Sequence, residues 1–271
     1  MFRHALLSCM MLCACLHLAQ AQQNAVVPDT AGVHAFSIAD TFLTYLREPI
    51  TPKPLRWEAI VVPAGLITYG TLSVTSGWLD DVNLLGRRWA SDNENPNYKT
   101  SIDDYTQLAP AAAVLGLRIA GIRGKNNIVD ETMLIAMSGA LMNAIVIPLK
   151  SFSREQRPDS SDNFSFPSGH TATAFLCAEF LRQEYKDRSP WIGAGGYAVA
   201  VLTGYLRMYN NKHWFSDVLA GAGVGIFSTR VSYWVYPKLK NLILGKPAPA
   251  TALLLPTYQS GMPGFCFVLS F

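Results

Sequence analysis

Apolar residues are concentrated in segments of helical length, and polar stretches separate these segments. The pattern predicts an apolar helix at Trp57–Leu79, a polar stretch at Asp80–Tyr105, and then five further helices. The five are Leu108–Ile122, Glu131–Leu149, Ser168–Tyr185, Pro190–Tyr209 and Trp214–Tyr236. Pro237 is expected to stop the last helix, because proline has no backbone N–H to donate. The predicted fold class is therefore all-α, a helical bundle of about six apolar helices.

The first residues are typical of an export signal. A short basic start precedes the apolar stretch Ala5–Leu18, and Ala19-Gln20-Ala21 has the small-residue pattern of a cleavage site. We expect a signal peptide at 1–21. An uncleaved anchor helix and a lipoprotein attached at Cys15 are the alternatives.

The remaining chain divides into three parts. Residues 22–56 form an N-terminal extension, 57–236 a helical domain and 237–271 a tail. In the tail, two short apolar runs flank a segment rich in turn residues, which predicts a short C-terminal β-hairpin. The two runs are Thr251–Tyr258 and Phe265–Phe271.

The composition narrows the class of protein. Hydrophobic residues make up 50% of the chain, charged residues 15%, and the mean hydropathy is +0.18. These values lie between those of an apolar soluble helical protein and of a modest integral membrane protein. A net charge of +3, without basic runs interleaved with aromatics, argues against nucleic-acid binding. Outside the signal only Cys177 and Cys266 remain, which gives neither a zinc pattern nor a disulfide framework.

Candidate chemistry is concentrated in three short clusters between Lys150 and Asp217. In the second cluster, Ser168 directly precedes an apolar helical run and is suited to cap it. The free N–H groups of a first helical turn bind anions, and Gly169 lets the backbone approach one closely. His170 would then stand beside the bound anion. The simpler interpretation is an ordinary helix cap with an unrelated histidine.

The third cluster pairs an imidazole with a carboxylate. His213 and Asp217 are four residues apart, hence on one face of the next helix. A carboxylate that holds one ring nitrogen leaves the other free to attack or to bind a ligand. Three cations, Lys150, Arg157 and Arg207, would repel a divalent metal and attract an oxyanion. We therefore expect no metal and no cofactor in this anion pocket.

Together the clusters resemble the three-part signature of the type 2 phosphatidic acid phosphatase and vanadium haloperoxidase family. That signature reads K-x6-R-P, then P-S-G-H, then S-R-x5-H-x3-D. Ten signature positions occur here at the right spacing between Lys150 and Asp217. One position departs, because Leu206 stands where the family has serine before the arginine. The change removes one hydroxyl contact to phosphate and is expected to tune affinity rather than abolish the chemistry.

The resemblance implies a role for each matching residue and a phosphatase that uses a covalent phosphohistidine. His213 would attack phosphorus, Asp217 would hold its other nitrogen, and His170 would protonate the leaving oxygen and later activate water. The phosphate oxygens would be bound by Lys150, Arg157, Ser168, Gly169 and Arg207.

The family and the apolar helices imply a phosphorylated envelope lipid as substrate, such as lipid A, undecaprenyl diphosphate or phosphatidic acid. A soluble periplasmic acid phosphatase, a vanadate-dependent haloperoxidase and a non-enzymatic binding protein are the alternatives. A cleaved signal followed by six spans would place the clusters in the cytoplasm. The clusters would stay outside the cytoplasm if the bundle lay in the periplasm at a membrane, or if the signal were not cleaved and the topology differed. The sequence does not predict an oligomeric state.

Overall fold

The computed structural model describes residues 44–45, 48, 50, 54, 56–76, 80–91, 99–244, 251–259 and 262–270. The expected signal peptide at 1–21 and most of the extension at 22–56 lie outside these residues. Ile50–Phe271 makes up one compact unit, separate from Met1–Pro49.

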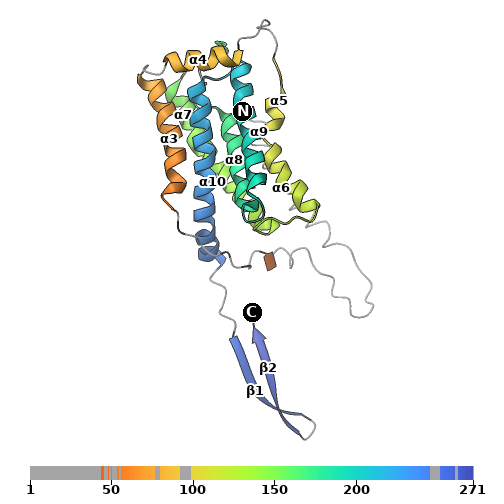
Figure 1. Cartoon of the computed structure of the whole chain (residues 1–271). Helices are drawn as coiled ribbons and strands as arrows, with labels where there is room; N and C mark the ends of the chain where they lie inside the picture. The colour runs from red at the N-terminus through yellow and green to blue at the C-terminus, as the bar shows by residue number, and fades with distance from the viewer. Residues whose placement is uncertain are drawn as a thin grey trace, which may run out of the picture. The chain divides into compact units, whose positions relative to one another are not determined.

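The described chain is dominated by helices that run side by side in alternating directions (Figure 1). Six helices form this bundle, at positions close to the six predicted, and the all-helical class of the domain is confirmed. They are α3 (Glu58–Ser76), α6 (Ala109–Ile119), α7 (Ile128–Ser153), α8 (Gly169–Tyr185), α9 (Pro190–Tyr209) and α10 (Phe215–Leu244).

Helix α8 lies at the centre of the bundle. It packs against α6, α7, α9 and α10, while α10 also packs against α3 and α7. Small residues bring α8 and α10 close together: a Cβ placed on Gly225 would lie 2.2 Å from the backbone oxygen of Ala172. Since both helices begin with residues of the predicted clusters, this close packing fixes the relative position of the clusters.

The prediction that Pro237 ends the last helix is wrong. Helix α10 continues through Pro237 to Leu244. An interior proline removes one backbone hydrogen bond, and side chains on both sides of Pro237 anchor this part of the helix to α7. The hydroxyl of Tyr236 donates to Asp130 Oδ1 at 2.6 Å, and Lys240 Nζ donates to the same oxygen at 2.8 Å. Helix α7 likewise contains Pro148 and extends to Ser153.

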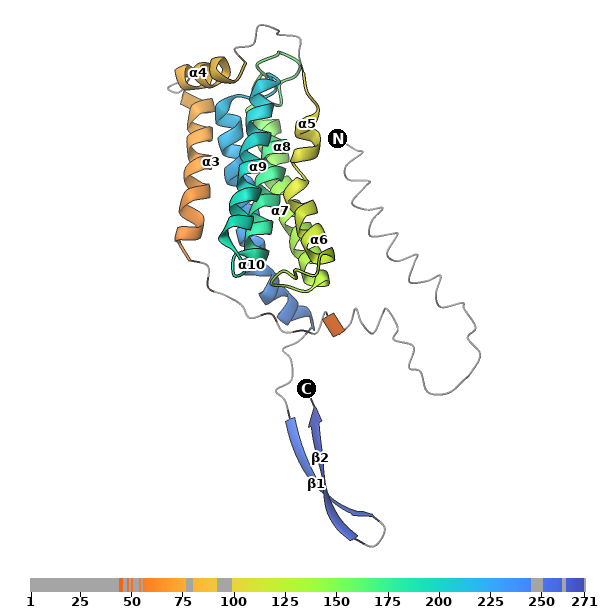
Figure 2. The ribbon, with the colours of Figure 1, turned by 45° about the vertical axis from the view of Figure 1, so that its right-hand side comes forward.

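The polar stretch Asp80–Tyr105 contains two helices that the sequence pattern did not predict, α4 (Asp80–Ser91) and α5 (Ile102–Thr106). Helix α4 lies across one end of the bundle (Figure 2). Its Asn83 joins two neighbours: the side-chain amide donates to Ser73 Oγ at 2.9 Å, and its oxygen accepts from the Ser216 N–H at 3.0 Å.

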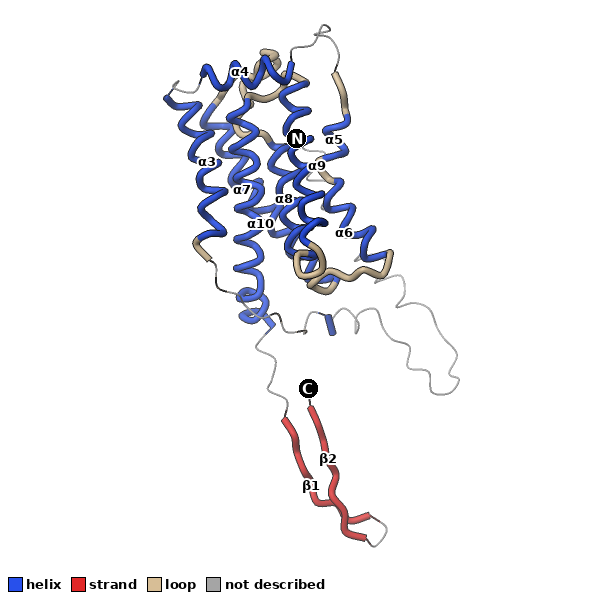
Figure 3. Tube along the Cα trace, in the orientation of Figure 1, coloured by secondary structure: helices blue, strands red, loops and turns tan. Residues whose placement is uncertain are grey.

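Two strands follow the bundle in sequence, β1 (Thr251–Gln259) and β2 (Met262–Ser270) (Figure 3). They pair antiparallel, with Thr251 opposite Ser270 and Gln259 opposite Met262. Their side chains are outside the described part of the structure, so a role for the expected hairpin stays a prediction.

Among the described helices, α7 has the length and composition of a membrane span. Its 26 residues contain an 18-residue window of mean hydropathy 1.8, and only 22% of that window is buried in the bundle. Shorter apolar helices occupy Ala59–Thr75 and Ala109–Ile119. The number of spans stays a prediction.

Candidate active site

The three predicted clusters meet at one end of the bundle because neighbouring helices run in opposite directions. Lys150 lies in the last turn of α7 and Arg207 in the last turn of α9. Ser168 caps α8, and Asp217 lies in the first turn of α10, four residues after His213. Two helix ends and two helix starts therefore contribute to the same region.

His213 and Asp217 lie together in the interior. The imidazole Nδ1 is 3.4 Å from Asp217 Oδ2, and the two side chains are 2% and 0% exposed. Asp217 Oδ2 also accepts from the Ser165 hydroxyl at 2.5 Å and from the Trp214 N–H at 2.8 Å. These contacts fix the carboxylate, which in turn leaves Nε2 of His213 as the nitrogen available for chemistry.

The environment keeps His213 neutral. Burial lowers the pKa of His213 to about 4, against the hydrogen bond and charge of Asp217, which raise it; Arg207 and Lys150 lower it further. For Asp217, burial raises the pKa, but the bond to His213 and the other hydrogen bonds outweigh burial and keep the pKa below its usual value. A neutral imidazole beside an ionised carboxylate is the form that a nitrogen nucleophile requires.

His170 contacts an acidic residue that the sequence analysis did not identify. Its Nε2 lies 2.8 Å from Oδ1 of Asp104, on α5. Burial and the charge of Arg207 lower the pKa of His170, while Asp104 and Asp103 raise it. With Nε2 engaged by Asp104, the contact leaves Nδ1 to exchange a proton with a bound group.

Arg207 is held by the same short helix. Its Nη1 donates to Asp103 Oδ2 at 2.5 Å, and both side chains are almost fully buried. The Asn210 amide donates to the other oxygen of Asp103 at 3.1 Å. The buried Nε of Arg207 has no hydrogen-bond partner among the described residues. A guanidinium N–H in this state is suited to receive an anionic oxygen.

The other two predicted cations are placed by the loop between α7 and α8. Lys150 Nζ donates to the carbonyl oxygens of Phe164 and Ser165 at 2.7 and 3.3 Å. Arg157 Nε donates to Asp162 Oδ1 at 2.7 Å. Arg157 interacts electrostatically with Lys150, and so does Arg207. Both arginines are therefore within electrostatic range of Lys150.

Ser168 and Gly169 begin α8 as the sequence predicted. The Ser168 side chain accepts from the Thr171 N–H at 3.4 Å and from the Thr171 hydroxyl at 2.9 Å. A Cβ on Gly169 would meet no atom of another segment within 4 Å. The space beside Gly169 is therefore open, which the close approach of an anion to this helix start requires.

Two further contacts join the loop before α8 to the loop before α10. Lys212 Nζ donates to Asp159 Oδ2 at 2.6 Å, and Trp214 Nε1 donates to the Gln156 carbonyl at 2.9 Å. Burial raises the pKa of Asp159, but the hydrogen bonds from Lys212 and Ser161 outweigh burial and lower it to about 2. The carboxylate is thus ionised at neutral pH, and the ion pair holds the two loops together.

One group among the described residues has the composition of a metal site. One potential ligand atom from each of Asp103, Asp104 and His170 lies within 4.8 Å of the others. Asp103 is already ion-paired with Arg207, whose charge would oppose a cation there. Arg207 already neutralises one of the two carboxylates, and metal independence stays a prediction.

Residues 131–241 match the family model described as PAP2 superfamily. This range contains every residue of the signature from Lys150 to Asp217. The matched segment belongs to the PAP2 superfamily, which confirms the family resemblance predicted from the motifs.

Two curated relatives are similar to the chain. A Lipid A 1-phosphatase of Porphyromonas gingivalis is 43% identical over 186 residues, which are 67% of this chain and 38% of the relative. A Lipid A 4'-phosphatase of Bacteroides thetaiotaomicron is 26% identical over 125 residues, 41% of this chain and 55% of the relative. The chain thus spans less than two thirds of each relative's length.

Two solved structures are also similar. The crystal structure of Aquifex aeolicus LpxE has 25% identity and a TM-score of 0.43, and the match covers 56% of this chain and 94% of that one. The crystal structure of a transmembrane PAP2-type phosphatidylglycerolphosphate phosphatase from Bacillus subtilis has 16% identity and a TM-score of 0.43. The match covers 68% of this chain and 98% of that one.

Proposed function

We propose that the chain is a metal-independent phosphatase of envelope lipids that forms a phosphohistidine at His213. The observation that carries the proposal is the buried arrangement of Ser165, Asp217 and His213 within electrostatic range of Arg207, whose Nε has no partner among the described residues. A neutral nucleophile within electrostatic range of a fixed guanidinium suits attack on a phosphate and does not require a metal.

The reaction would proceed in two steps. Nε2 of His213 attacks phosphorus as the bond to the leaving oxygen breaks, and protonated His170 donates its proton to that oxygen. Neutral His170 then takes a proton from water, whose oxygen attacks phosphorus and breaks the P–N bond. Arg207, Lys150 and Arg157 would stabilise the negative charge on the phosphate oxygens in both steps.

The substrate class is proposed from the relatives and from the surface. The Porphyromonas gingivalis relative carries the name Lipid A 1-phosphatase, so lipid A is the first candidate among envelope lipid phosphates. Large apolar side chains are also exposed along the bundle, which is typical of a surface that contacts lipid. They include Val61, Val62, Leu115, Ile119, Met133, Ile147, Trp191 and Val201.

We therefore place the protein at a membrane of the cell envelope, with its active site outside the cytoplasm. A cleaved signal at 1–21 and a C-terminal β-hairpin that acts as a small flap or dimer contact belong to the same proposal.

The test is phosphate release from a panel of lipids by the purified full chain. The panel contains lipid A, undecaprenyl diphosphate, phosphatidic acid and a soluble phosphate ester. We expect release from at least one lipid in preference to the soluble ester, and none by a folded His213→Ala variant. Preference for the soluble ester would favour a soluble acid phosphatase instead, and halide oxidation with added vanadate would favour a haloperoxidase.

A further inference from the structure

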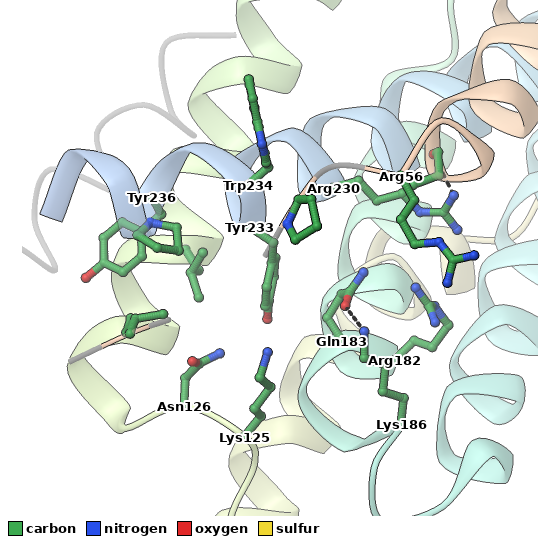
Figure 4. A pocket seen from close by; sticks show the side chains of 15 residues that line it. Arg56, Lys125, Asn126, Arg182, Gln183, Lys186, Arg230, Tyr233, Trp234 and Tyr236 are labelled. Atoms are coloured by element: carbon green, nitrogen blue, oxygen red, sulfur yellow. Dashed lines mark hydrogen bonds between the residues drawn. The ribbon is translucent and has the colours of Figure 1, made fainter. Parts of the chain in front are cut away.

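A second group of charged residues lies at the other end of the bundle. There, the last turns of α8 and the second half of α10 face the loop before α7, and they enclose a cavity of about 460 Å³ (Figure 4). This volume is within the range of about 300–1,000 Å³ that is typical of small-molecule sites. The motifs of the family signature contribute no residue to the lining of this cavity.

Positive charge dominates the lining. Five of the lining residues are basic and none is acidic; the basic ones are Arg56, Lys125, Arg182, Lys186 and Arg230. They come from four separate segments of the chain, so that their charges converge on the cavity from several sides. A cleft lined by charges of one sign concentrates an anion of the opposite sign.

Two buried carboxylates, Glu179 and Glu184, stand behind the lining. Glu179 accepts from Arg182 Nε at 2.8 Å and from Arg230 Nε at 2.9 Å, so one carboxylate serves two guanidinium groups. Glu184 accepts from the Tyr233 hydroxyl and from the Asn126 amide. These contacts fix the positions of the lining side chains.

The cavity is separate from the candidate active site. Arg182 follows His170 by twelve residues on α8, and Arg230 follows Asp217 by thirteen on α10. At a rise of 1.5 Å per residue these separations are roughly 18–20 Å. A phosphate bound between His170 and His213 therefore cannot reach the basic residues of the cavity.

The lining also has an apolar part. Leu134, Trp234 and Pro237 contribute to it, and Figure 4 shows Tyr233 of α10 directed toward Lys125. A cavity lined by both cations and apolar side chains suits a ligand with a charged group and an apolar body.

We propose that this cavity binds the phosphate group of an anionic phospholipid headgroup, as a ligand and not as a substrate. Basic pockets between helices near a membrane surface bind such headgroups, and arginine can bind phosphate oxygens in pairs. The inference does not depend on the reaction at His213, because it requires neither the catalytic histidines nor any covalent step.

The test compares two pairs of substitutions that remove the same charge from the same two segments. Lys125→Gln with Lys186→Gln removes two cations of the cavity. Arg123→Gln with Arg188→Gln removes two exposed cations that do not line it. Neither pair includes the arginines bound to Glu179, so we expect both variants to fold, which circular dichroism checks.

Binding of phosphatidylglycerol to the full chain in neutral detergent is measured by native mass spectrometry, with phosphatidylcholine as reference. Phosphatidylglycerol is a phosphodiester without a terminal phosphate, so it is not a substrate of the proposed reaction. We expect one lipid bound to the wild type and to the Arg123/Arg188 variant, and about tenfold weaker binding to the Lys125/Lys186 variant. Equal binding by both variants, or no preference over phosphatidylcholine, overturns the proposal.

Inorganic phosphate identifies the source of the recognised group. Competition by millimolar phosphate, weaker in the Lys125/Lys186 variant, supports recognition of the phosphate itself. If phosphate binds with this difference between the variants but phosphatidylglycerol does not bind, the headgroup proposal is wrong and the ligand is a soluble phosphate. Release of phosphate from the lipid panel is measured in parallel. Absence of phosphate release by the wild-type protein would contradict the proposed function, and the binding result would be unaffected.

Discussion

Asp104 Oδ1 lies 2.8 Å from Nε2 of His170, so a carboxylate on the short helix α5 holds the imidazole at the start of α8. The two residues are 66 positions apart in the sequence. The contact orients the ring, and it raises the pKa of His170 against burial and the charge of Arg207, which lower it. The net effect leaves the pKa of His170 below its usual value, so Asp104 is a positioning residue that only partly offsets burial in favour of the protonated ring.

Replacement of this carboxylate should change the pH dependence of the reaction. The proposed mechanism needs His170 protonated in the first step, so kcat/KM falls at alkaline pH as the proton is lost. In Asp104→Asn the pKa of His170 falls, and the alkaline limb of the kcat/KM profile should move to lower pH. At pH values above the limb, kcat/KM should be lower than in the wild type by roughly tenfold for each pH unit by which the limb moves. Asp187→Asn, at an exposed acid beyond α8, is the control, and an unmoved limb would contradict the role of Asp104.

Arg207 should not tolerate replacement by lysine. Lysine keeps the charge, but its donors share one nitrogen and cannot reproduce the guanidinium fork, in which Nη1 bonds Asp103 while Nε stays open. We expect Arg207→Lys to lower kcat/KM by about 100- to 1,000-fold, mostly through kcat, as for the loss of one donor to a charged transition state. The same substitution at the exposed Arg154 should have no effect. Comparable activity of Arg207→Lys and wild type would show that the guanidinium geometry is unimportant.

The fold of the bundle was largely predictable because its long helices carry continuous apolar segments. Helix α4 was not predictable in this way, because its buried face consists of small and polar residues. Asn83, Gly86 and Ala90 point inward at helical spacing, whereas Leu85 and Trp89 are 67% and 73% exposed. A Cβ on Gly86 would lie 2.9 Å from Phe215, so close packing selects the small residue there. Hydrophobic periodicity does not detect such a face.

The residues of the candidate site were likewise predictable only where their contacts are local in the sequence. Residues recognised by local spacing, such as His213 with Asp217 or Ser168 at its cap, lie where the motifs predicted. Ser165 and the acids of α5 were missed because their contacts join positions far apart in the sequence. Asp103 reaches Arg207 across 104 residues, and no local pattern predicts that contact.

The close packing of α8 on α10 should depend on Gly225. A Cβ there would meet backbone atoms of Ala172 and Leu176 at 2.2 and 2.8 Å, which cannot move without shifting α8. We expect Gly225→Ala to lower the free energy of unfolding by about 1–3 kcal/mol or more.

Gly195, on α9, is the matched control because a Cβ there would meet nothing within 4 Å. Gly195→Ala should raise stability by about 0.5–1 kcal/mol through its better helix propensity. Thermal unfolding of both variants measures the difference. Equal melting temperatures would contradict the close approach of the two helices.

Removal of metal ions should not affect turnover. The group formed by Asp103, Asp104 and His170 already holds Arg207, and the proposed reaction stabilises phosphate charge with side-chain cations. We expect full phosphate release after dialysis against EDTA. Loss of activity that magnesium or zinc restores would establish a metal in the reaction and displace the proposed role of the cations.

The central claim is that phosphate passes through a covalent bond to His213. Wild-type protein mixed rapidly with its best lipid substrate and quenched in alkali, where phosphohistidine survives, is digested and analysed by mass spectrometry. The account predicts a phosphate on the peptide that contains His213, formed and lost within the time of one turnover. Phosphate on another residue, or turnover by the folded His213→Ala variant, would contradict it.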